Sequence, residues 1–371
     1  MRVGVPAEIK NQEHRVGLTP ASVRELSARG HEVLVQSGAG AGIGMSDEAY
    51  RSSGAIVRDS AAEVWAAGDL IVKVKEPQPA EFALMRRGQV LFTYLHLAPD
   101  VEQVRRLLAA DVVAIAYETV RGPGHSLPLL SPMSEVAGCM AVQVGAHYLE
   151  HQAGGAGVLL GGIPGVEAAR VLVLGGGVVG SHAVRVAMGM GAQVTVIDRS
   201  LPQLRALDLE FGSRLNTIYS TLHAIESQVA AADLVIGAVL VPGGAAPKLV
   251  SRAMVRGMRA GSVLVDVAID QGGCFETSRP TTHASPVYVE EGVLHYCVGN
   301  MPGAVPRTAT AALNNATLPY VMALAEKGYR RALLEDAGLL AGLNIHRGVV
   351  SCEPVAVAQG LPFQPPEQVL R

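Results

Sequence analysis

Aromatic residues and cysteines are scarce in this chain of 371 residues. Only 4% of its residues are aromatic, with a single Trp, although 49% are hydrophobic. The four cysteines, Cys139, Cys274, Cys297 and Cys352, are widely spaced and form no Cys-x-x-Cys pair. This spacing argues against a zinc site and a disulfide framework, so we expect reduced thiols, and no other ligand cluster argues for a metal.

The chain also has no large excess of positive or negative charge and no long apolar run. The net charge of −3 is small, and no block of basic residues points to nucleic acid. No uncharged apolar run approaches the roughly 20 residues of a membrane span. The first residues, MRVGVPAEIK, carry charge and contain no apolar secretory core. We therefore expect a cytoplasmic protein with neither nucleic-acid nor membrane partners.

The sequence is instead rich in Val, Ala, Gly and Leu, which suits parallel sheets covered by helices on both faces. Short β-branched runs alternate with helical stretches, and Thr19-Pro20 is a typical helix start. The pattern predicts an α/β fold of two doubly wound Rossmann-like domains with parallel sheets and a cleft between them. The strands predicted in the first domain are Arg2–Val5, Glu32–Gln36, Leu70–Val74, Gln89–Tyr94 and Val112–Ala116. Those predicted in the second are Arg170–Leu174, Gln193–Ile197, Leu234–Val239 and Ser262–Val267.

The domain boundaries follow from composition. Residues 119–132 are rich in Gly and Pro, and a long helix is predicted from Ser134 to about His151, so we place the first crossing between domains there. After Pro302 the strand rhythm stops, and Thr308–Leu340 is predicted to be mostly helical and to return to the first domain. We expect a substrate domain of residues 1–130 plus 307–371 and a dinucleotide-binding domain of residues 131–306.

The strongest local motif is Gly175-Gly-Gly177-Val-Val-Gly180, which follows an apolar strand and precedes a helix. Gly175 allows a tight turn, Gly177 leaves room for a pyrophosphate, and Gly180 lets the helix pack closely on the strand. The helix N-terminus offers N–H groups to the phosphates. A flavin-binding or ligand-sensing Rossmann domain is the alternative.

The next strand of this domain ends at Asp198, where an acidic residue is expected in a dinucleotide site. Its carboxylate can accept both hydroxyls of the adenosine ribose and would repel a 2′-phosphate. This favours NAD over NADP. Arg199 follows directly, and because an arginine there can accommodate NADP, the strictness of the preference stays open.

Ligands bind beyond the carboxyl ends of strands in open α/β sheets, so polar residues that follow strands are candidates for the site. This rule selects Lys75, His96, Glu118 and Asp270, together with Arg15 in the loop after the first strand. We compared this set with what an NAD-dependent oxidation of an amino acid would need. Such a site needs cations that bind the substrate carboxylate and a proton acceptor near the amine. Arg15 can bind a carboxylate bidentately, and Lys75 can supply a second cation.

His96 is the natural general acid/base of this set, and Asp270 could relay protons, orient water or face the nicotinamide. Each residue also has a plainer interpretation. His96 could be structural, Arg15 and Lys75 could be surface charges, and Asp270 could cap the turn before Gln271-Gly-Gly. Glu118 is expected to support the site or an interface rather than to react.

Several long and unusual segments resemble the bacterial alanine dehydrogenases over essentially the whole chain. They are MRVGVPAEIKNQEHRVGLTP, LIVKVKEP, LFTYLHLA, LSPMSEVAG, GGIPGVEAARVLVLGGGVVG, DLVIGAVLVPG, VLVDVAIDQGGCFETSRPTTH and CVGNMPGAVPRT. The resemblance implies NAD-dependent oxidative deamination of L-alanine to pyruvate and ammonium, its reversal, and a homohexamer. It also implies that hydride transfer gives an imine, to which water adds with proton transfer through His96.

The resemblance further implies roles for individual residues. Arg15 and Lys75 correspond to substrate-binding residues, and His96 and Asp270 to the catalytic acid/base pair. The implied cofactor contacts, including the glycine loop, are Ser134, Gly175, Gly177, Val178, Val179, Gly180, Asp198, Ser220, Val239, Leu240, Ile269, Asp270, Asn300 and Met301. The chain departs from some members at Gln203, where they have an arginine; Arg199 or Arg205 could substitute.

Three other functions remain open. The NAD-binding subunit of a proton-translocating transhydrogenase shares the fold but performs no amino acid chemistry. A saccharopine-type dehydrogenase would take a larger substrate. A non-catalytic NAD-binding sensor would not need polar residues at every strand end.

Overall fold

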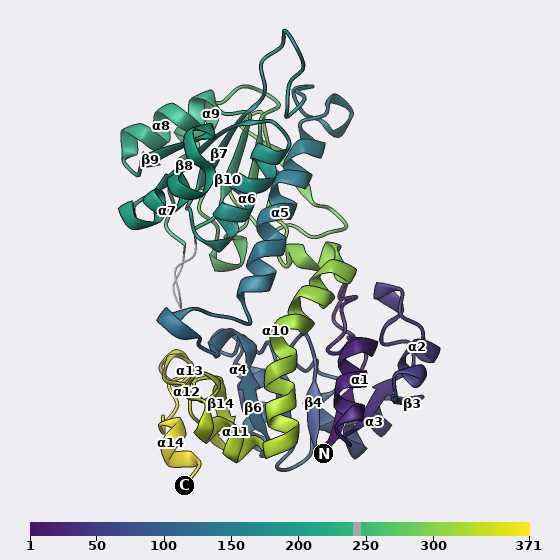
Figure 1. The fold of residues 1–371 in the computed structure, drawn as a ribbon. Coiled ribbons are helices and arrows are strands. Elements are labelled where there is room, and N and C mark those ends of the chain that lie inside the picture. The colour runs from purple at the N-terminus through teal and green to yellow at the C-terminus, as the bar shows by residue number, and fades with distance from the viewer. Residues whose placement is uncertain (240–245) are drawn as a thin grey trace. The chain divides into compact units, whose positions relative to one another are not determined.

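The computed structural model describes residues 1–239 and 246–371. The chain divides into two compact units (Figure 1). Unit 1 contains Met1–Met133 and Val305–Arg371, and unit 2 contains Ser134–Ala304. No helix of the described part of the chain is long and apolar enough to cross a membrane.

Unit 1 is built around a sheet in which the described residues form eight strands, in the order β15-β14-β6-β5-β4-β1-β2-β3. The run from β6 to β3 is parallel, whereas β14 and β15 are antiparallel to their neighbours. The strand bounds are Arg2–Val5 (β1), Glu32–Gln36 (β2), Ile56–Arg58 (β3), Leu70–Val72 (β4), Val90–Thr93 (β5), Val113–Ala116 (β6), Leu343–His346 (β14) and Val349–Val350 (β15).

Both faces of this sheet are buried at its centre, because alternate residues of β4, β5 and β6 belong to different hydrophobic clusters. Leu70 and Val72 of β4 belong to one hydrophobic cluster, whereas Ile71 belongs to the other. The first cluster includes residues of α1 and α10, and the second includes residues of α3, α4 and α13. The helices of unit 1 are α1 (Pro20–Ala28), α2 (Asp47–Ser52), α3 (Ala61–Ala67), α4 (Val101–Ala109), α10 (Pro306–Lys327), α11 (Tyr329–Glu335), α12 (Ala337–Leu340), α13 (Glu353–Gln359) and α14 (Pro366–Val369).

Unit 2 has a sheet in which the described residues form seven strands, in the order β12-β13-β11-β10-β7-β8-β9. All neighbours are parallel except the antiparallel pair β12 and β13. The strands are Arg170–Leu174 (β7), Gln193–Asp198 (β8), Leu215–Tyr219 (β9), Leu234–Gly237 (β10), Val263–Asp266 (β11), Val287–Glu290 (β12) and Val293–Tyr296 (β13). The helices are α5 (Ser131–Tyr148, which begins in unit 1), α6 (Val178–Gly189), α7 (Leu201–Phe211), α8 (Leu222–Ala231) and α9 (Arg252–Arg256).

Each sheet is wound in two directions from its first strand. In unit 1 the chain adds β2 and β3 on one side of β1 and then β4, β5 and β6 on the other. In unit 2 it adds β8 and β9 beside β7 and then continues with β10, β11 and β13. Loops at such a reversal diverge and leave a crevice beyond the carboxyl ends of the strands. The β1/β4 and β7/β10 loops are therefore where ligand-binding side chains are expected.

The predicted α/β, doubly wound fold is confirmed, and all nine predicted strands are present with ends that differ by no more than two residues. Thr19 caps α1 by accepting a hydrogen bond from the Ser22 N–H, with Pro20 in the first turn, as expected. The helix predicted from Ser134 begins earlier, at Ser131.

The prediction that strands end after Pro302 is wrong, because β14 and β15 follow the C-terminal helices. The predicted parallel arrangement holds for most strand pairs of both sheets, whereas the antiparallel strands at their edges were not predicted. β14 pairs with β6, more than 200 residues earlier in the chain, and no local pattern shows such a partner. β3 and β9 were missed because they are edge strands with partly exposed residues, which lack a continuous apolar run.

Candidate functional site

Arg15 lies in the loop after β1 and is almost completely buried, with 2% of its surface exposed. Its partner is Glu13: Nε and Nη2 of Arg15 donate to the two carboxylate oxygens at 2.7 and 2.6 Å. Nη1 lies 3.0 Å from Sδ of Met133. Burial alone would raise the pKa of Glu13, but hydrogen bonds from Arg15 and the charges of Arg15 and Lys75 lower it to about 2. Glu13 thus binds Arg15 bidentately, through the edge of the guanidinium that carries Nε and Nη2.

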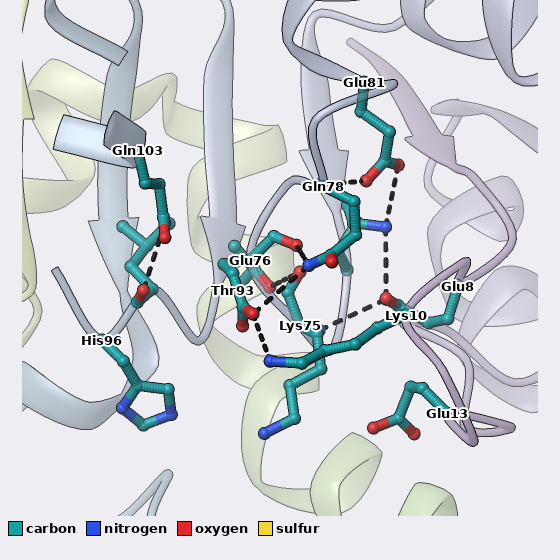
Figure 2. Close-up of polar contacts among 12 residues, drawn as sticks. Glu8, Lys10, Glu13, Lys75, Glu76, Gln78, Glu81, Thr93, His96 and Gln103 are labelled. Carbon is teal, nitrogen blue, oxygen red and sulfur yellow. Dashed lines mark hydrogen bonds and ion pairs between the residues drawn. The ribbon is translucent and has the colours of Figure 1, made fainter. Parts of the chain in front are cut away.

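Lys75 follows β4, and its backbone is fixed on both sides. The N–H is 3.3 Å from Oε1 of Glu8, and the carbonyl accepts a hydrogen bond of 2.9 Å from Oγ1 of Thr93. Nζ has no hydrogen-bond partner among residues 1–239 and 246–371, and Figure 2 shows it pointing away from these anchors. Burial, followed by the charges of Arg15 and Lys10, lowers the pKa of the Lys75 ammonium. The buried ammonium therefore lies near the cations Arg15 and Lys10 as well as the carboxylates Glu76 and Glu13, and a further anion beside it would stabilise its charge.

His96 follows β5 and has a left-handed backbone with φ of 49°, which is uncommon for a residue with a side chain. Its N–H donates to Oε1 of Glu118 at 2.6 Å, and Nδ1 lies 3.9 Å from the same oxygen. The ring stacks on Tyr94 with centroids 5.8 Å apart, and half of the side chain is exposed. The imidazole is therefore oriented but accessible.

These three side chains belong to one region of unit 1. Figure 2 shows the charged ends of Lys75 and Glu13 and the ring of His96 pointing to the same lower part of the view. The charge of Arg15 lowers the pKa of Lys75 and also acts on Tyr94, the ring against which His96 stacks. The strand-end rule thus selected residues that lie together.

The glycine loop after β7 has the geometry that its motif predicts. Gly175 has φ of 98°, and a Cβ at that position would lie 2.8 Å from the carbonyl oxygen of Ala238. A Cβ on Gly180 would lie 1.8 Å from the Gly175 oxygen, whereas one on Gly177 would meet nothing within 4 Å. Gly177 is the N-cap of α6 and makes no side-chain capping bond. The space at Gly177 and the uncapped helix start are suited to a phosphate group.

Asp198, at the end of β8, connects this loop to the next one. Oδ2 accepts the N–H of Gly176 and Oδ1 accepts the N–H of Ser200, both at 2.7 Å. Each carboxylate oxygen retains a further lone pair for a hydroxyl group. Gln203, which stands where some family members have an arginine, also contacts the glycine loop: its Nε2 donates to the carbonyl of Gly176 at 2.7 Å.

Asp270 is exposed and lies in the turn Ile269–Gln271 beyond β11. Gly299 lies directly against it, since a Cβ there would be 2.8 Å from Oδ1 of Asp270. Asn300 follows with φ of 55°, and its carbonyl lies 3.2 Å from Nε2 of His283. Two segments that are distant in sequence, one with Asp270 and one with Asn300, thus meet at the carboxyl edge of this sheet.

The remaining predicted cofactor contacts lie on the same unit. Val239 lies beside the glycine loop, with Cγ1 3.1 Å from a Cβ built on Gly175. The N–H of Ser220 bonds to the carbonyl of Asp198. The other members of the set are Ser134 in α5, Val178 and Val179 at the start of α6, and the buried residues Ile269 and Met301. Leu240 lies outside the described residues.

Sequence reasoning missed the residues that contact the predicted site residues. Three contacts were not predicted: the hydrogen bonds of Glu13 with Arg15, the hydrogen bond of Glu8 with the Lys75 backbone, and the stacking of Tyr94 on His96. Lys73, two residues before Lys75, was not predicted either. Lys73 is buried and paired with Glu8 and Glu81 at 3.2 and 2.9 Å.

The described residues include no group of three or more His, Cys, Asp or Glu side chains that could hold a metal ion. Arg15 and Lys75 are neighbouring cations, and paired cations of this kind suit an organic anion. Unit 2 offers features suited to a dinucleotide, namely the glycine loop and Asp198.

Comparison with known proteins gives the family. The model of the alanine dehydrogenase/PNT N-terminal domain matches residues 4–137, and the model of the C-terminal domain matches residues 141–353. A protein of Halomonas elongata named alanine dehydrogenase is 57% identical over 98% of both chains. A solved L-alanine dehydrogenase structure is 54% identical over 96% of this chain and 99% of that chain, with a TM-score of 0.94.

A transhydrogenase structure from Sinorhizobium meliloti is more distant. It is 27% identical, covers 94% of this chain and 100% of that one, and has a TM-score of 0.83. The resemblance inferred from sequence motifs is therefore confirmed over the whole length of the chain. This chain belongs to the alanine dehydrogenase/PNT family.

Proposed function

We propose that this protein is an NAD-dependent alanine dehydrogenase, which converts L-alanine to pyruvate and ammonium and catalyses the reverse reaction. Relatives named alanine dehydrogenase are 50–57% identical over at least 98% of the chain, whereas identity to the transhydrogenase is 27%. The observation that carries the proposal is the grouping of Arg15, Lys75 and His96 at the ends of β1, β4 and β5, because these side chains fit a 2-amino or 2-oxo acid.

Unit 1 is the substrate domain in this proposal. Arg15 and Lys75 carry two positive charges and Glu13 one negative charge, so the substrate carboxylate balances the net charge of the three. Nε and Nη2 of Arg15 already donate to Glu13, so a carboxylate bound at this guanidinium competes with Glu13 for its N–H groups. The unbonded Nζ of Lys75 donates to the carboxylate or to the neighbouring oxo group.

Proton transfer is assigned to His96, assisted by Asp270. The ring of His96 is half exposed and its Nδ1 faces Glu118, so Nε2 is available to water and to the amine. In deamination, His96 accepts a proton from the attacking water and returns one to the departing ammonia. Asp270, in the turn after β11, is assigned to orient water or relay protons. The reverse direction uses the same groups in the opposite order.

Unit 2 is the dinucleotide-binding domain. The open position of Gly177 and the uncapped start of α6 would hold the pyrophosphate, and Asp198 would accept the ribose hydroxyls. The other residues assigned to the cofactor are Ser134, Val178, Val179, Ser220, Val239, Leu240, Ile269, Asn300 and Met301. When bound, NAD takes up the hydride from Cα of the amino acid. A homohexameric assembly and a cytoplasmic location belong to the same proposal and rest on the family resemblance.

The decisive test follows NADH absorbance after the protein is mixed with pyruvate and ammonium. We expect rapid oxidation of NADH that requires both substrates, and much slower oxidation of NADPH. If NADH is not oxidised with pyruvate at any ammonium concentration, the protein is not an alanine dehydrogenase. Oxidation with a larger 2-oxo acid but not with pyruvate would instead favour a dehydrogenase for a different amino acid.

Changing Asp198 to Asn should relax the choice of cofactor. The amide keeps an oxygen for a backbone N–H, but it loses the negative charge that would repel a 2′-phosphate. We expect the ratio of kcat/KM for NADH over NADPH to fall by about tenfold or more, which corresponds to the roughly 1.4 kcal/mol of one strong interaction. Initial rates with each cofactor give this ratio. An unchanged ratio would mean that Asp198 only supports the loop.

A further inference from the structure

Two carboxylates in unit 1 bind the backbone at the ends of neighbouring strands in the same way. After β4, Glu8 accepts the N–H groups of Val74 and Lys75. After β5, Glu118 accepts the N–H groups of Leu95 and His96. In each pair, the second residue carries a side chain assigned to the reaction. Figure 2 shows both of these side chains extending from the carboxyl ends of their strands.

The contact of Glu8 is short and completely buried. Oε1 lies 2.6 Å from the Val74 nitrogen and 3.3 Å from the Lys75 nitrogen, and 1% of the Glu8 side chain is exposed. Oε2 pairs with Lys73 at 3.2 Å, and Glu81 pairs with the same ammonium at 2.9 Å. Glu8 is thereby fixed through one oxygen and holds the backbone of Lys75 through the other.

The contact of Glu118 fixes a strained backbone. Both of its oxygens lie 3.2 Å from the Leu95 nitrogen, and Oε1 lies 2.6 Å from that of His96. The φ of 49° at His96 is unfavourable for a residue with a Cβ, so the chain needs such contacts to hold it there. Nδ1 of His96 is 3.9 Å from the same carboxylate. Glu118 thus binds the backbone of His96 and also lies near Nδ1 of its ring.

We propose that Glu8 and Glu118 are positioning residues for Lys75 and His96, and that each controls a different kinetic parameter. The proposal rests on the function proposed above. Glu8 keeps the Lys75 ammonium in place to bind the substrate carboxylate, so its loss weakens substrate binding. Glu118 keeps His96 in place to transfer protons, so its loss slows turnover. Misplacement of a reacting group by about 1 Å can cost about 100-fold in rate.

The test compares Glu8→Gln and Glu118→Gln with the control Glu25→Gln, which changes an exposed carboxylate on α1. Glu8→Gln leaves Lys73 paired with Glu81, so this variant keeps a buried counter-ion. We expect Glu8→Gln to raise KM for pyruvate by about 10-fold or more with kcat little changed. Glu118→Gln should lower kcat by about 10- to 100-fold with KM little changed. Glu118→Ala should be worse than Glu118→Gln, since the amide oxygen still accepts one N–H.

Hydrogen exchange provides a readout that does not depend on activity. In Glu8→Gln the amides of Val74 and Lys75 should exchange faster, and in Glu118→Gln those of Leu95 and His96, with the rest of unit 1 unchanged. Equal effects of both variants on KM and kcat, or unchanged exchange at these amides, would overturn the proposal. If the unmodified protein does not oxidise NADH with pyruvate, the proposed function fails. The exchange data then still decide whether the carboxylates fix these two strand ends.

Discussion

Replacing His96 by alanine should lower kcat for pyruvate amination by about 10²–10⁴-fold, the usual contribution of a general acid/base. The affinity for NADH should not change, because His96 belongs to unit 1 and the cofactor is assigned to residues of unit 2. The protein should fold normally, since half of the His96 side chain is exposed. Stopped-flow kinetics and fluorescence titration with NADH measure the two quantities.

The matched control is His223→Ala, which removes an exposed imidazole from α8. Its kcat and NADH affinity should equal those of the unmodified protein. A His96→Ala variant with nearly full kcat would remove His96 from the proton-transfer step. A variant that lost NADH affinity to the same extent as kcat would show that the residue has a structural role.

Replacing Arg15 by methionine should abolish substrate saturation and strongly destabilise unit 1. The change removes the guanidinium that donates to both oxygens of Glu13, whose side chain is 1% exposed. Removing one partner of a buried ion pair costs about 3–5 kcal/mol, because the other charge stays buried. The double variant Arg15→Met/Glu13→Gln should recover much of this stability but no substrate binding. Denaturant unfolding and steady-state kinetics separate these effects.

The stability loss should also depend on pH in a defined direction. In the unmodified protein the pKa of Glu13 is lowered from 4.5 to about 2, so its stabilising effect is complete above pH 4.5 and lost as the pH falls through 2. Without Arg15, the burial that raises this pKa dominates, and acid then favours the folded state at this group. The difference in melting temperature between the two proteins should therefore narrow on acidification. A difference that stays constant from pH 6 to pH 3 would contradict the ion-pair explanation.

The sequence predicted the residues at strand ends because their positions follow from periodicity alone. A buried parallel strand is a visible apolar run, and the residue after it must lie at the carboxyl edge of the sheet. Lys75, His96 and the glycine loop were found in this way. The resemblance to a known family then assigned their roles, and the family itself is confirmed by full-length relatives.

The supporting residues could not be predicted in the same way. Glu13, Glu8 and Tyr94 act through contacts whose partners are set by tertiary packing and backbone direction. A buried glutamate has the same sequence signature as a surface glutamate, since each is a polar residue in a loop. The strand β14 was missed for a related reason, because an antiparallel edge formed by the C-terminal segment leaves no local repeat.

The discontinuous make-up of unit 1 has a consequence for the order of folding during synthesis. Unit 2 is contained in one continuous segment and can be completed while the last part of unit 1 is still unmade. Until Leu343–His346 leaves the ribosome, the outer edge of Val113–Ala116 has no strand beside it. An open edge of buried, apolar residues is prone to pair with other chains. The nascent protein should therefore depend on chaperones most strongly between completion of its second domain and release of its C-terminus.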